Sequence, residues 1–426
     1  MRESIKKRIE AVRRGEVPEG YSMERAMLFP DEWGTPVTLN TVLSENKNRN
    51  EDLRFGKEDV LSVSGEQGVV NQIALLGRSY AGESVAPYHV VETGDVVYTK
   101  SPLKENPYGI IKQNRGAPGI VSTLYAVYHC SSPITGQYLE NYFCIDTFLN
   151  NYLKPLVKRG AKNDMKVNNE EVLLGRIPIP PIEEQKKINS LIAQFDRVID
   201  LKQKLIEEKR RQKQWLMQKL LSESSGVNEI KLFTLCSTIC DGDWIESKDQ
   251  SEYGIRLVQT GNVGVGRYLD KEGRARYISQ ETFDRMHCTE VFPGDVLLSR
   301  LPDPIGRACM IPELPTRAIT AVDCTILRFK DADEAEFFLQ YATSKEYFNK
   351  IALLAGGSTR TRISRKEIEK LLIPVPASKT AMQKISKGLS LADQEISALE
   401  QELAAWQQKK KALMQLLLTG LVRVNA

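Results

Sequence analysis

The chain contains 426 residues, of which 41% are hydrophobic and 27% charged, with a formal net charge of +4. Because this length exceeds a single ordinary core, it suits two domains of about 150 residues each plus connecting helices. The small positive charge excludes a general coat of basic side chains, so nucleic acid is permitted as a partner only at local basic surfaces.

The first 21 residues, MRESIKKRIEAVRRGEVPEGY, predict a short basic helix that ends at Gly15 and not a secretory signal. No run approaches the ~18 consecutive apolar residues of a membrane-spanning helix. We therefore expect a cytoplasmic protein that does not contact a membrane. The seven cysteines lie at irregular spacings, which predicts buried, reduced thiols. Cys236 and Cys240 are four residues apart without a second paired cluster, so no metal site is predicted.

Residues 21–178 are typical of a loop-rich α/β domain. The segments PVTLNTVLSE, DVLSVSGEQGVV, YHVVETGDVVYTK and TLYAVYHC predict short strands, and ENYFCIDTFLNNYLKPLVKRG predicts a closing helix. The loops supply forked donors, amides and hydroxyls, which are the groups that read bases and hold phosphates in DNA. The candidate DNA contacts in this region are Ser64, Gln67, Lys100, Lys104, Asn106, Tyr108, Lys112, Gln113, Arg115, Lys162 and Asn163.

A long amphipathic helix is predicted within residues 179–225, after the proline segment that begins at Arg176. Its apolar residues recur at alternating steps of four and three, as the seam between two paired helices requires. Lys202, Lys209 and Lys213 also fall on this seam. Either they extend over a solvated stretch of the helix pair, or they face DNA phosphates or acidic groups of a partner. The apolar seam positions are Ile188, Ile192, Phe195, Ile199, Ile206, Leu216 and Leu220.

Residues 226–375 predict a second domain of the same kind, with strands in GIRLVQTGNVGVGRY, VFPGDVLLSRL and DCTILRFK and a closing helix in EAEFFLQYATSKEYFNKIALLAGG. Its candidate DNA contacts are Gln259, Thr260, Asn262, Arg267, Arg300, Arg307, Ser358, Thr359, Arg360 and Arg362. Arg360 and Arg362 are favoured because Gly356 and Gly357 let the backbone approach a phosphate. Each candidate in either domain has the alternative interpretation of a solvated loop residue.

The second half of the chain repeats the organisation of the first. A second long helix is predicted within residues 376–426, and its seam lies 197 residues after that of the first helix, at Ile385, Leu389, Ile396, Leu399, Leu403, Trp406, Leu413 and Leu417. The phrases Gly94-Asp95-Val96 and Gly294-Asp295-Val296 also repeat. Two such helices can pair antiparallel and hold the domains at the two ends of the pair. A helix from Ile188 to Leu220 would span about 48 Å, at ~1.5 Å per residue. That arrangement suits two reading heads on one DNA duplex.

The ordered set of motifs resembles the DNA-specificity subunit of type I restriction-modification systems over essentially the whole chain. It is carried by the proline segments IPIPP and IPVP, the helix starts Gln185-Lys186-Lys187-Ile188 and Gln383-Lys384-Ile385, the two Gly-Asp-Val phrases and the loop Gly357-Ser358-Thr359-Arg360. The resemblance implies an α+β fold, in which two α/β target recognition domains are separated by two long antiparallel coiled-coil helices with a pseudo-two-fold internal repeat. It also implies that the helix in residues 1–20 lies beside the end of the second long helix.

The resemblance further implies a non-catalytic chain that recognises a bipartite sequence in double-stranded DNA. The implied partners are two methyltransferase subunits and, in a full complex, restriction/translocase subunits. No cofactor is expected on this chain, whereas S-adenosylmethionine is expected in the partner methyltransferase, which would methylate an adenine flipped from each half-site.

Two other classes of function are open on the residues alone. One is a two-headed coiled-coil scaffold that binds proteins without DNA specificity, and salt-dependent, sequence-selective duplex binding separates it from a DNA reader. The other is a concealed nuclease that would cleave DNA alone with a metal ion. Asn106-Pro107-Tyr108 lacks one proline of the adenine methyltransferase motif, and Glu83 stands where a phosphate-binding loop needs lysine. We therefore predict no active site.

Overall fold

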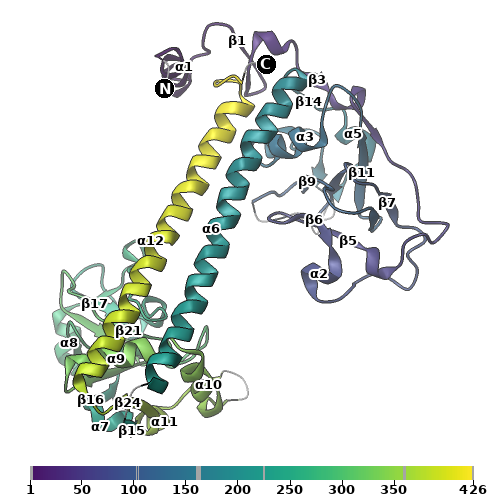
Figure 1. Ribbon diagram of the computed structural model, residues 1–426. Coiled ribbons are helices and arrows are strands. Elements are labelled where there is room, and N and C mark those ends of the chain that lie inside the picture. The colour runs from purple at the N-terminus through teal and green to yellow at the C-terminus, as the bar shows by residue number, and fades with distance from the viewer. Residues whose placement is uncertain are drawn as a thin grey trace. The chain divides into compact units, whose positions relative to one another are not determined.

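The computed structural model describes residues 3–101, 103, 105–159, 165–223, 226–357 and 361–424 (Figure 1). By their contacts the residues form two compact units. Unit 1 comprises Met1–Leu201 with Leu403–Ala426, and unit 2 comprises Lys202–Glu402. This division cuts both long helices, whereas the sequence-based division treated each helix as a separate segment. The contacts cut the helices because different parts of each helix pack into different cores: Ile188 and Leu417 belong to a core of unit 1, and Met217 and Ile385 to a core of unit 2.

The central element of unit 1 is a four-stranded antiparallel sheet in the order β4-β11-β8-β9, formed by Leu43–Glu45, Tyr125–Cys130, Val96–Thr99 and Ile110–Gln113. Two-stranded antiparallel pairs join β1 (Tyr21–Glu24) to β2 (Met27–Pro30), β3 (Val37–Thr38) to β14 (Arg176–Ile177), β5 (Leu61–Ser64) to β6 (Gly68–Asn71), β7 (His89–Val91) to β10 (Gly119–Val121) and β12 (Lys158–Arg159) to β13 (Met165–Lys166).

The short helices of unit 1 are α1 (Glu3–Arg13), α2 (Gln72–Leu76), α3 (Gly136–Phe143), α4 (Asp146–Leu153) and α5 (Asn169–Val172). The single closing helix predicted for this domain is wrong, because the chain breaks at Cys144 and Ile145 into α3 and α4. The Thr135 hydroxyl caps α3 by accepting from the backbone N–H of Tyr138.

Unit 2 contains two four-stranded sheets. The first has the order β16-β23-β20-β21, formed by Cys236–Asp241, Cys324–Phe329, Val296–Ser299 and Ala308–Met310. The second has the order β18-β17-β22-β19, formed by Tyr277–Ile278, Ile255–Val258, Ala318–Thr320 and Glu290–Val291, and its β17–β22 pairing is parallel. A separate antiparallel pair joins β15 (Val227–Lys231) to β24 (Leu372–Pro376).

The short helices of unit 2 are α7 (Leu232–Leu235), α8 (Gln280–Met286), α9 (Ala332–Tyr341), α10 (Lys345–Leu354) and α11 (Arg365–Lys370). Here too the single predicted closing helix is wrong, because the Ser344 side chain caps a new helix by accepting from Tyr347 N–H. A hydroxyl cap therefore divides the predicted helix in unit 2, whereas Ile145 at the start of α4 in unit 1 makes no side-chain cap hydrogen bond.

The internal repeat is visible in the sheets. The order β16-β23-β20-β21 in unit 2 matches β4-β11-β8-β9 in unit 1. The central strands β8 and β20 are buried on both faces, since alternate side chains enter different cores: Val96 and Val97 in β8 belong to separate apolar clusters, as do Val296 and Leu297 in β20. This double burial explains why both strands are continuous apolar runs.

The repeated Gly-Asp-Val phrases form equivalent turns before β8 and β20. Gly94 and Gly294 have φ of 98° and 90°, a region that glycine occupies without strain. The following Asp95 and Asp295 are buried and accept the N–H of the residue three positions earlier, both at 2.9 Å. A side chain from the neighbouring strand contacts each carboxylate, the Arg328 guanidinium in unit 2 and the His129 imidazole in unit 1. The phrase is therefore a structural motif of the sheet.

The two long helices are α6 (Ile182–Glu223) and α12 (Lys379–Leu418). They pair antiparallel, because early residues of one contact late residues of the other within each unit. In unit 1, Asp196 accepts from Lys410 and the Phe195 ring packs on Trp406. In unit 2, where the later part of α6 lies beside the early part of α12 (Figure 1), Lys213 donates to Asp393 at 2.7 Å. The pairs Asp196–Lys410 and Asp393–Lys213 are related by the 197-residue repeat.

The seam residues that were predicted from the heptads are all buried or half-buried. The heptads missed Met217 and Met414, which are more buried than the predicted neighbours Leu216 and Leu413. A straight helix drifts relative to a strict seven-residue repeat, so the buried stripe moves along the helix. Met217 and Met414 accordingly pack into the domain cores of unit 2 and unit 1.

The N-terminal segment of unit 1 contacts the C-terminal end of α12. Tyr21, Leu28 and Leu421 form an apolar cluster on which Val12 of α1 and Leu416 of α12 pack. The Tyr21 hydroxyl donates to the Gly420 carbonyl at 2.6 Å. Nearby, the buried Glu184 carboxylate accepts from Arg423 at 2.7 and 2.8 Å and from the Trp33 indole at 3.0 Å. The buried Glu184 carboxylate thus joins the start of α6 to Trp33 and to the segment that follows α12.

The expectation of buried thiols is wrong for one cysteine. All seven cysteines are free, but Cys144 is exposed, while Cys130 and Cys240 are half-buried. No helix in the described part of the chain is both long and apolar enough to cross a lipid bilayer.

Candidate nucleic-acid interface

A basic depression of about 550 Å³ lies on the surface of the unit 2 domain. It is formed by three separate stretches of loop, and its lining residues are Gln250, Ser251, Gln259, Gly261, Asn262, Lys271, Arg274, Ala275 and Arg276. The lining contains three cations, two glutamines and one asparagine, and no acidic residue. Arginine and glutamine are the residues that make bidentate contacts with guanine and adenine in the major groove.

The wall of the depression is built on hydrogen bonds from Asn262. The buried Asn262 side chain accepts from Gln259 N–H at 3.0 Å and donates to the Leu269 carbonyl at 2.9 Å. It thereby joins the short 3-10 turn Thr260–Asn262 to the loop that carries Lys271 and Arg274. The Arg307 guanidinium also holds this turn, because it donates to the carbonyls of Thr260 and of Val263, the residue that follows the turn.

The cations of the depression are available to a ligand. Among the residues that the structure describes, the side chains of Lys271 and Arg274 have no ion-pair or hydrogen-bond partner, and both are exposed. Arg276 donates to the neutral amide of Gln250 at 2.5 Å and has no acidic partner in the described part of the chain. Uncompensated cations around a polar hollow favour an anionic ligand, and amides beside them add the means to discriminate between bases.

The described second-domain candidates divide among this depression, the interior and the surface outside the depression. Gln259 lines the depression, and Thr260 lies in its supporting turn. Asn262 also lines it, although its side chain is occupied by the two backbone bonds. Arg267 lies outside the depression, on the loop that carries Lys271 and Arg274. Its exposed side chain approaches Glu400 at 3.5 Å.

Arg300 and Arg307 hold the domain together. Arg300 is buried and donates to Asp241 at 2.9 Å and to the Val322 carbonyl at 2.7 Å. Arg307 donates to five backbone carbonyls. Burial lowers the pKa of both guanidinium groups. Both are therefore omitted from the proposed DNA surface.

Arg362 lies at the base of the glycine loop. Its backbone exchanges two hydrogen bonds with Gly356, at 2.8 and 3.0 Å, and its guanidinium approaches Asp323 at 3.2 Å. Gly357 has a φ of 119°, which favours glycine. Ser358, Thr359 and Arg360 lie outside the described residues, as do Lys104, Lys162 and Asn163 of the first domain.

The first-domain candidates that the structure describes do not form one cluster. Ser64 and Gln67 lie in the turn between β5 and β6, where the Ser64 hydroxyl accepts two backbone N–H groups. Lys112 is buried between the Cys144 sulfur, at 3.2 Å, and Glu140, which also pairs with Arg115.

The other described first-domain candidates are tied to the fold. Asn106 donates to Asp146 at 3.0 Å, and Gln113 donates to the Gly94 carbonyl at 3.3 Å. The Tyr108 carbonyl accepts from the Tyr98 hydroxyl. Burial lowers the pKa of Lys100. Among the described candidates of unit 1, Gln67 and Arg115 are exposed, and Arg115 pairs with Glu140 while Gln67 lies on a turn.

Sequence reasoning missed Lys271, Arg274 and Arg276, which give the depression its charge. The available signal was the run KEGRAR, in which three cations recur within six residues beside a glycine. This run follows the predicted candidate Arg267, but nothing in its spacing indicated that Gln250 and Gln259 fold against it.

Neither interpretation of the seam lysines is complete. Lys202, Lys209 and Lys213 form ion pairs with Glu402, Glu395 and Asp393 of α12 in the same unit. They therefore face acidic groups, as one interpretation required, but those groups belong to this chain. Among the described residues, no group of three or more His, Cys, Asp or Glu side chains is arranged to hold a metal ion.

Comparison with known proteins identifies the family. A family model described as the type I restriction modification DNA specificity domain matches residues 119–209 and 240–405, which together exceed half of the chain. The chain belongs to this family. The family match takes in every lining residue of the depression and a part of each long helix.

Two curated relatives come from Methanocaldococcus jannaschii. The MjaX specificity subunit is 28% identical over 292 residues, and the MjaVIII type I restriction enzyme specificity subunit is 25% identical over 271 residues. The matches cover 65% and 59% of this chain, and 65% and 63% of the relatives, so the chain spans slightly less than two thirds of their length.

A solved structure from a study of complex assembly and conformational transition of the type I R-M system has the same fold. The match has a TM-score of 0.56 at 17% identity, and covers 96% of this chain and 100% of that chain. The predicted α+β class, with two domains and two long paired helices, is confirmed by this likeness and by the helices and sheets described above.

Proposed function

We propose that this chain is the DNA-specificity subunit of a type I restriction-modification complex, in which each unit reads one half of a bipartite DNA target. The observation that carries the proposal is the basic depression of unit 2, where the cations Lys271 and Arg274 are uncompensated beside Gln250 and Gln259. Membership of the specificity-domain family and the names of the curated relatives support it.

The proposed role is non-catalytic. The chain would position two methyltransferase subunits, which carry S-adenosylmethionine, on an adenine in each half-site, and would join restriction subunits in a full complex. Its place of action would be the cytoplasm. The alternative of a protein-binding scaffold gives no reason for an uncompensated basic hollow lined by amides, so the DNA-reading role is preferred.

Arg274→Ala tests this role. The full chain, co-expressed with its methyltransferase partner, should bind its target ~1–3 kcal/mol more weakly if Arg274 reads a base, and the discrimination against changes in one half-site should fall. If Arg274 contacts a phosphate instead, the loss should be smaller, equal for all sequences, and reduced by salt. Binding is measured by titration of labelled duplexes at two salt concentrations.

Arg285→Ala is the matched control, because Arg285 is an exposed arginine of the same domain that pairs with Asp249 outside the depression. The control should bind as the unaltered chain does. Equal binding by Arg274→Ala and Arg285→Ala would exclude the depression, and a complete lack of sequence-selective binding by the unaltered chain would favour the scaffold.

A further inference from the structure

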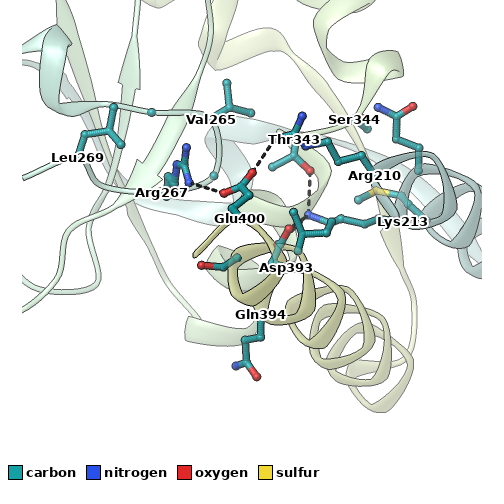
Figure 2. Close-up of a pocket in the computed structure, with 16 residues that line it drawn as sticks. Arg210, Lys213, Val265, Arg267, Leu269, Thr343, Ser344, Asp393, Gln394 and Glu400 are labelled. Atoms are coloured by element: carbon teal, nitrogen blue, oxygen red, sulfur yellow. Dashed lines mark hydrogen bonds and ion pairs between the residues drawn. The ribbon is translucent and has the colours of Figure 1, made fainter. Parts of the chain in front are cut away.

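One loop of unit 2 connects the depression to the two long helices. In the segment Gly264–Leu269, Arg267 extends toward α12, where its Nη1 lies 3.5 Å from Oε2 of Glu400. The other oxygen of Glu400 accepts from Nη2 of Arg210 on α6 at 2.6 Å. Figure 2 shows Arg267 and Arg210 approaching Glu400 from the loop and from α6. We name Arg210, Glu400 and Arg267 the Glu400 bridge.

The same loop continues into the wall of the depression. Arg267 precedes Lys271 by four residues. Between them, Leu269 exchanges hydrogen bonds with Asn262, through its N–H at 2.8 Å and its carbonyl at 2.9 Å. The turn itself is closed by the Gly264 N–H, which donates to the Arg267 carbonyl at 3.0 Å. Arg267 is therefore linked to the cations that face the depression by a short segment that is hydrogen-bonded to Asn262.

The loop has space in which to move. A cavity of about 670 Å³ separates it from the helices, and the residues facing this cavity include Lys213, Met217, Val265 and Ile396. On the far side, Lys213 is fixed by Asp393 and lies 3.4 Å from the Thr343 hydroxyl (Figure 2). The backbone beside Arg267 is held by the Gly266 N–H, which donates to the Ala308 carbonyl at 2.8 Å, whereas the Arg267 side chain, which lies beside the cavity, is held by its charged contact with Glu400.

The restraint is also a weak one. The Arg267 side chain is 67% exposed, and exposed ion pairs contribute little stability individually. A weak contact between a loop and a helix can set where the loop rests without being needed for folding. The two functions, folding and positioning, can therefore be separated by substitution.

We infer that Glu400 is a positioning residue for DNA recognition: from the helix pair it holds the loop that carries Lys271 and Arg274, and so it tunes how unit 2 reads its half-site. This inference rests on the proposed function. Glu400 contacts arginines of both the helix and the loop, so a partner that shifts α6 against α12 would change the reading of one half-site through this residue.

The test is a double-mutant cycle on the full chain co-expressed with its methyltransferase partner. Duplexes carry single base changes in either half-site, and the ratio of affinities gives the discrimination. Glu400→Gln and Arg267→Gln should each reduce discrimination in one half-site by about two- to five-fold, as expected for loss of an exposed ion pair. The double variant should lose no more than either single variant, because both changes break one contact.

Glu402→Gln is the matched control. Glu402 lies two residues away on α12 and pairs with Lys202 of α6, away from the loop. It should leave both half-sites unchanged. The half-site read by unit 1 is an internal control, since a general loss of folding would alter both halves together.

Three results would overturn the inference. Equal discrimination by Glu400→Gln and Glu402→Gln would show that the bridge does not position the loop. Additive losses in the double variant would show that Arg267 contacts DNA directly. Equal losses in both half-sites would indicate a general structural effect. If the unaltered chain shows no sequence selectivity in the same titrations, the proposed function itself fails, and this inference fails with it.

Discussion

Arg307 and Arg274 show how differently one residue type can act within a single domain. Arg307 donates to five backbone carbonyls through all three of its guanidinium nitrogens, so its guanidinium is committed to contacts within the fold. Arg274 has no partner among the described residues and faces the depression. A guanidinium that is already satisfied cannot contact a base without breaking those bonds, whereas a solvated one exchanges water for the base. The two arginines therefore differ in availability, which their sequence neighbourhoods do not reveal.

His89 of β7 should make the stability of unit 1 depend on pH. Burial, and to a smaller extent the neighbouring Arg49, lower the pKa of His89 from 6.5 to about 4. The unfolded chain takes up a proton near pH 6.5, so the folded state binds fewer protons between pH 6.5 and 4. Stability is therefore complete above about pH 6.5 and is lost as the pH falls toward 4.

The expected loss between pH 7 and 5 is about 1–2 kcal/mol more for the unaltered chain than for His89→Gln, which has no titrating ring. Urea unfolding at the two pH values, with a probe in unit 1, measures this difference. An identical pH dependence of the two proteins would show that His89 does not titrate in this window.

At the residue scale, sequence reasoning found the chemistry of the candidate site better than its location. It selected Gln259 and Thr260, which lie at the depression, but it also selected Arg300 and Lys112, which are buried. Residue type indicates what a side chain can bind. Whether it is free to do so depends on contacts between distant segments, such as that of Arg300 with Asp241, 59 residues away.

The elements that the sequence predicted best are those with a hydrophobic repeat that extends over many residues. The long helices α6 and α12 follow the heptads, and even their ion pairs repeat, since Lys213 and Lys410 occupy equivalent positions opposite Asp393 and Asp196. The short elements were predicted less well. The break between α9 and α10 depends on a cap at Ser344, which periodicity does not detect. The second sheet of unit 2 includes the parallel β17–β22 pairing between segments about 60 residues apart, which no local pattern specifies.

The seam of the helix pair should tolerate charge unequally along its length. Ile396 is buried with 8% exposure, whereas Ile199, the equivalent residue of α6, is half-buried. Ile396→Asp places an unpaired carboxylate in the interior and should cost about 3 kcal/mol or more, while Ile199→Asp should cost roughly half as much because water reaches that position. Chemical unfolding of the two variants measures the order.

The exposed residue Gln394 supplies the control, since Gln394→Asp introduces the same charge on the same helix at the surface. It should leave the unfolding free energy within about 0.5 kcal/mol of the unaltered value. Equal costs for Ile396→Asp and Gln394→Asp would contradict the burial of this part of the seam.

For the whole molecule, the repeat separates a shared scaffold from parts that differ. Both units contain the same four-stranded sheet order, two helices after its last strand, and a strand pair next to the long helix. They differ between these shared parts: unit 2 builds its second sheet and the depression there, whereas unit 1 has the β5–β6 hairpin and α2. The differing parts contain the depression and the exposed Gln67, as expected if each unit reads a different half-site on a common scaffold.

This separation predicts the outcome of a domain exchange with a relative. Residues 236–329 contain all eight strands of the two four-stranded sheets of unit 2 and the depression. The flanking β15, β24 and α9 stay in place, and with them the contact between Gln340 of α9 and Asp393 of α12. Replacing residues 236–329 should therefore change the bases of one half of the methylated sequence and leave the other half intact. Mapping of methylated adenines in a host that carries the exchanged chain measures both halves at once. A change in both halves would contradict independent reading, and an unchanged target would place the reading surface outside these sheets and loops.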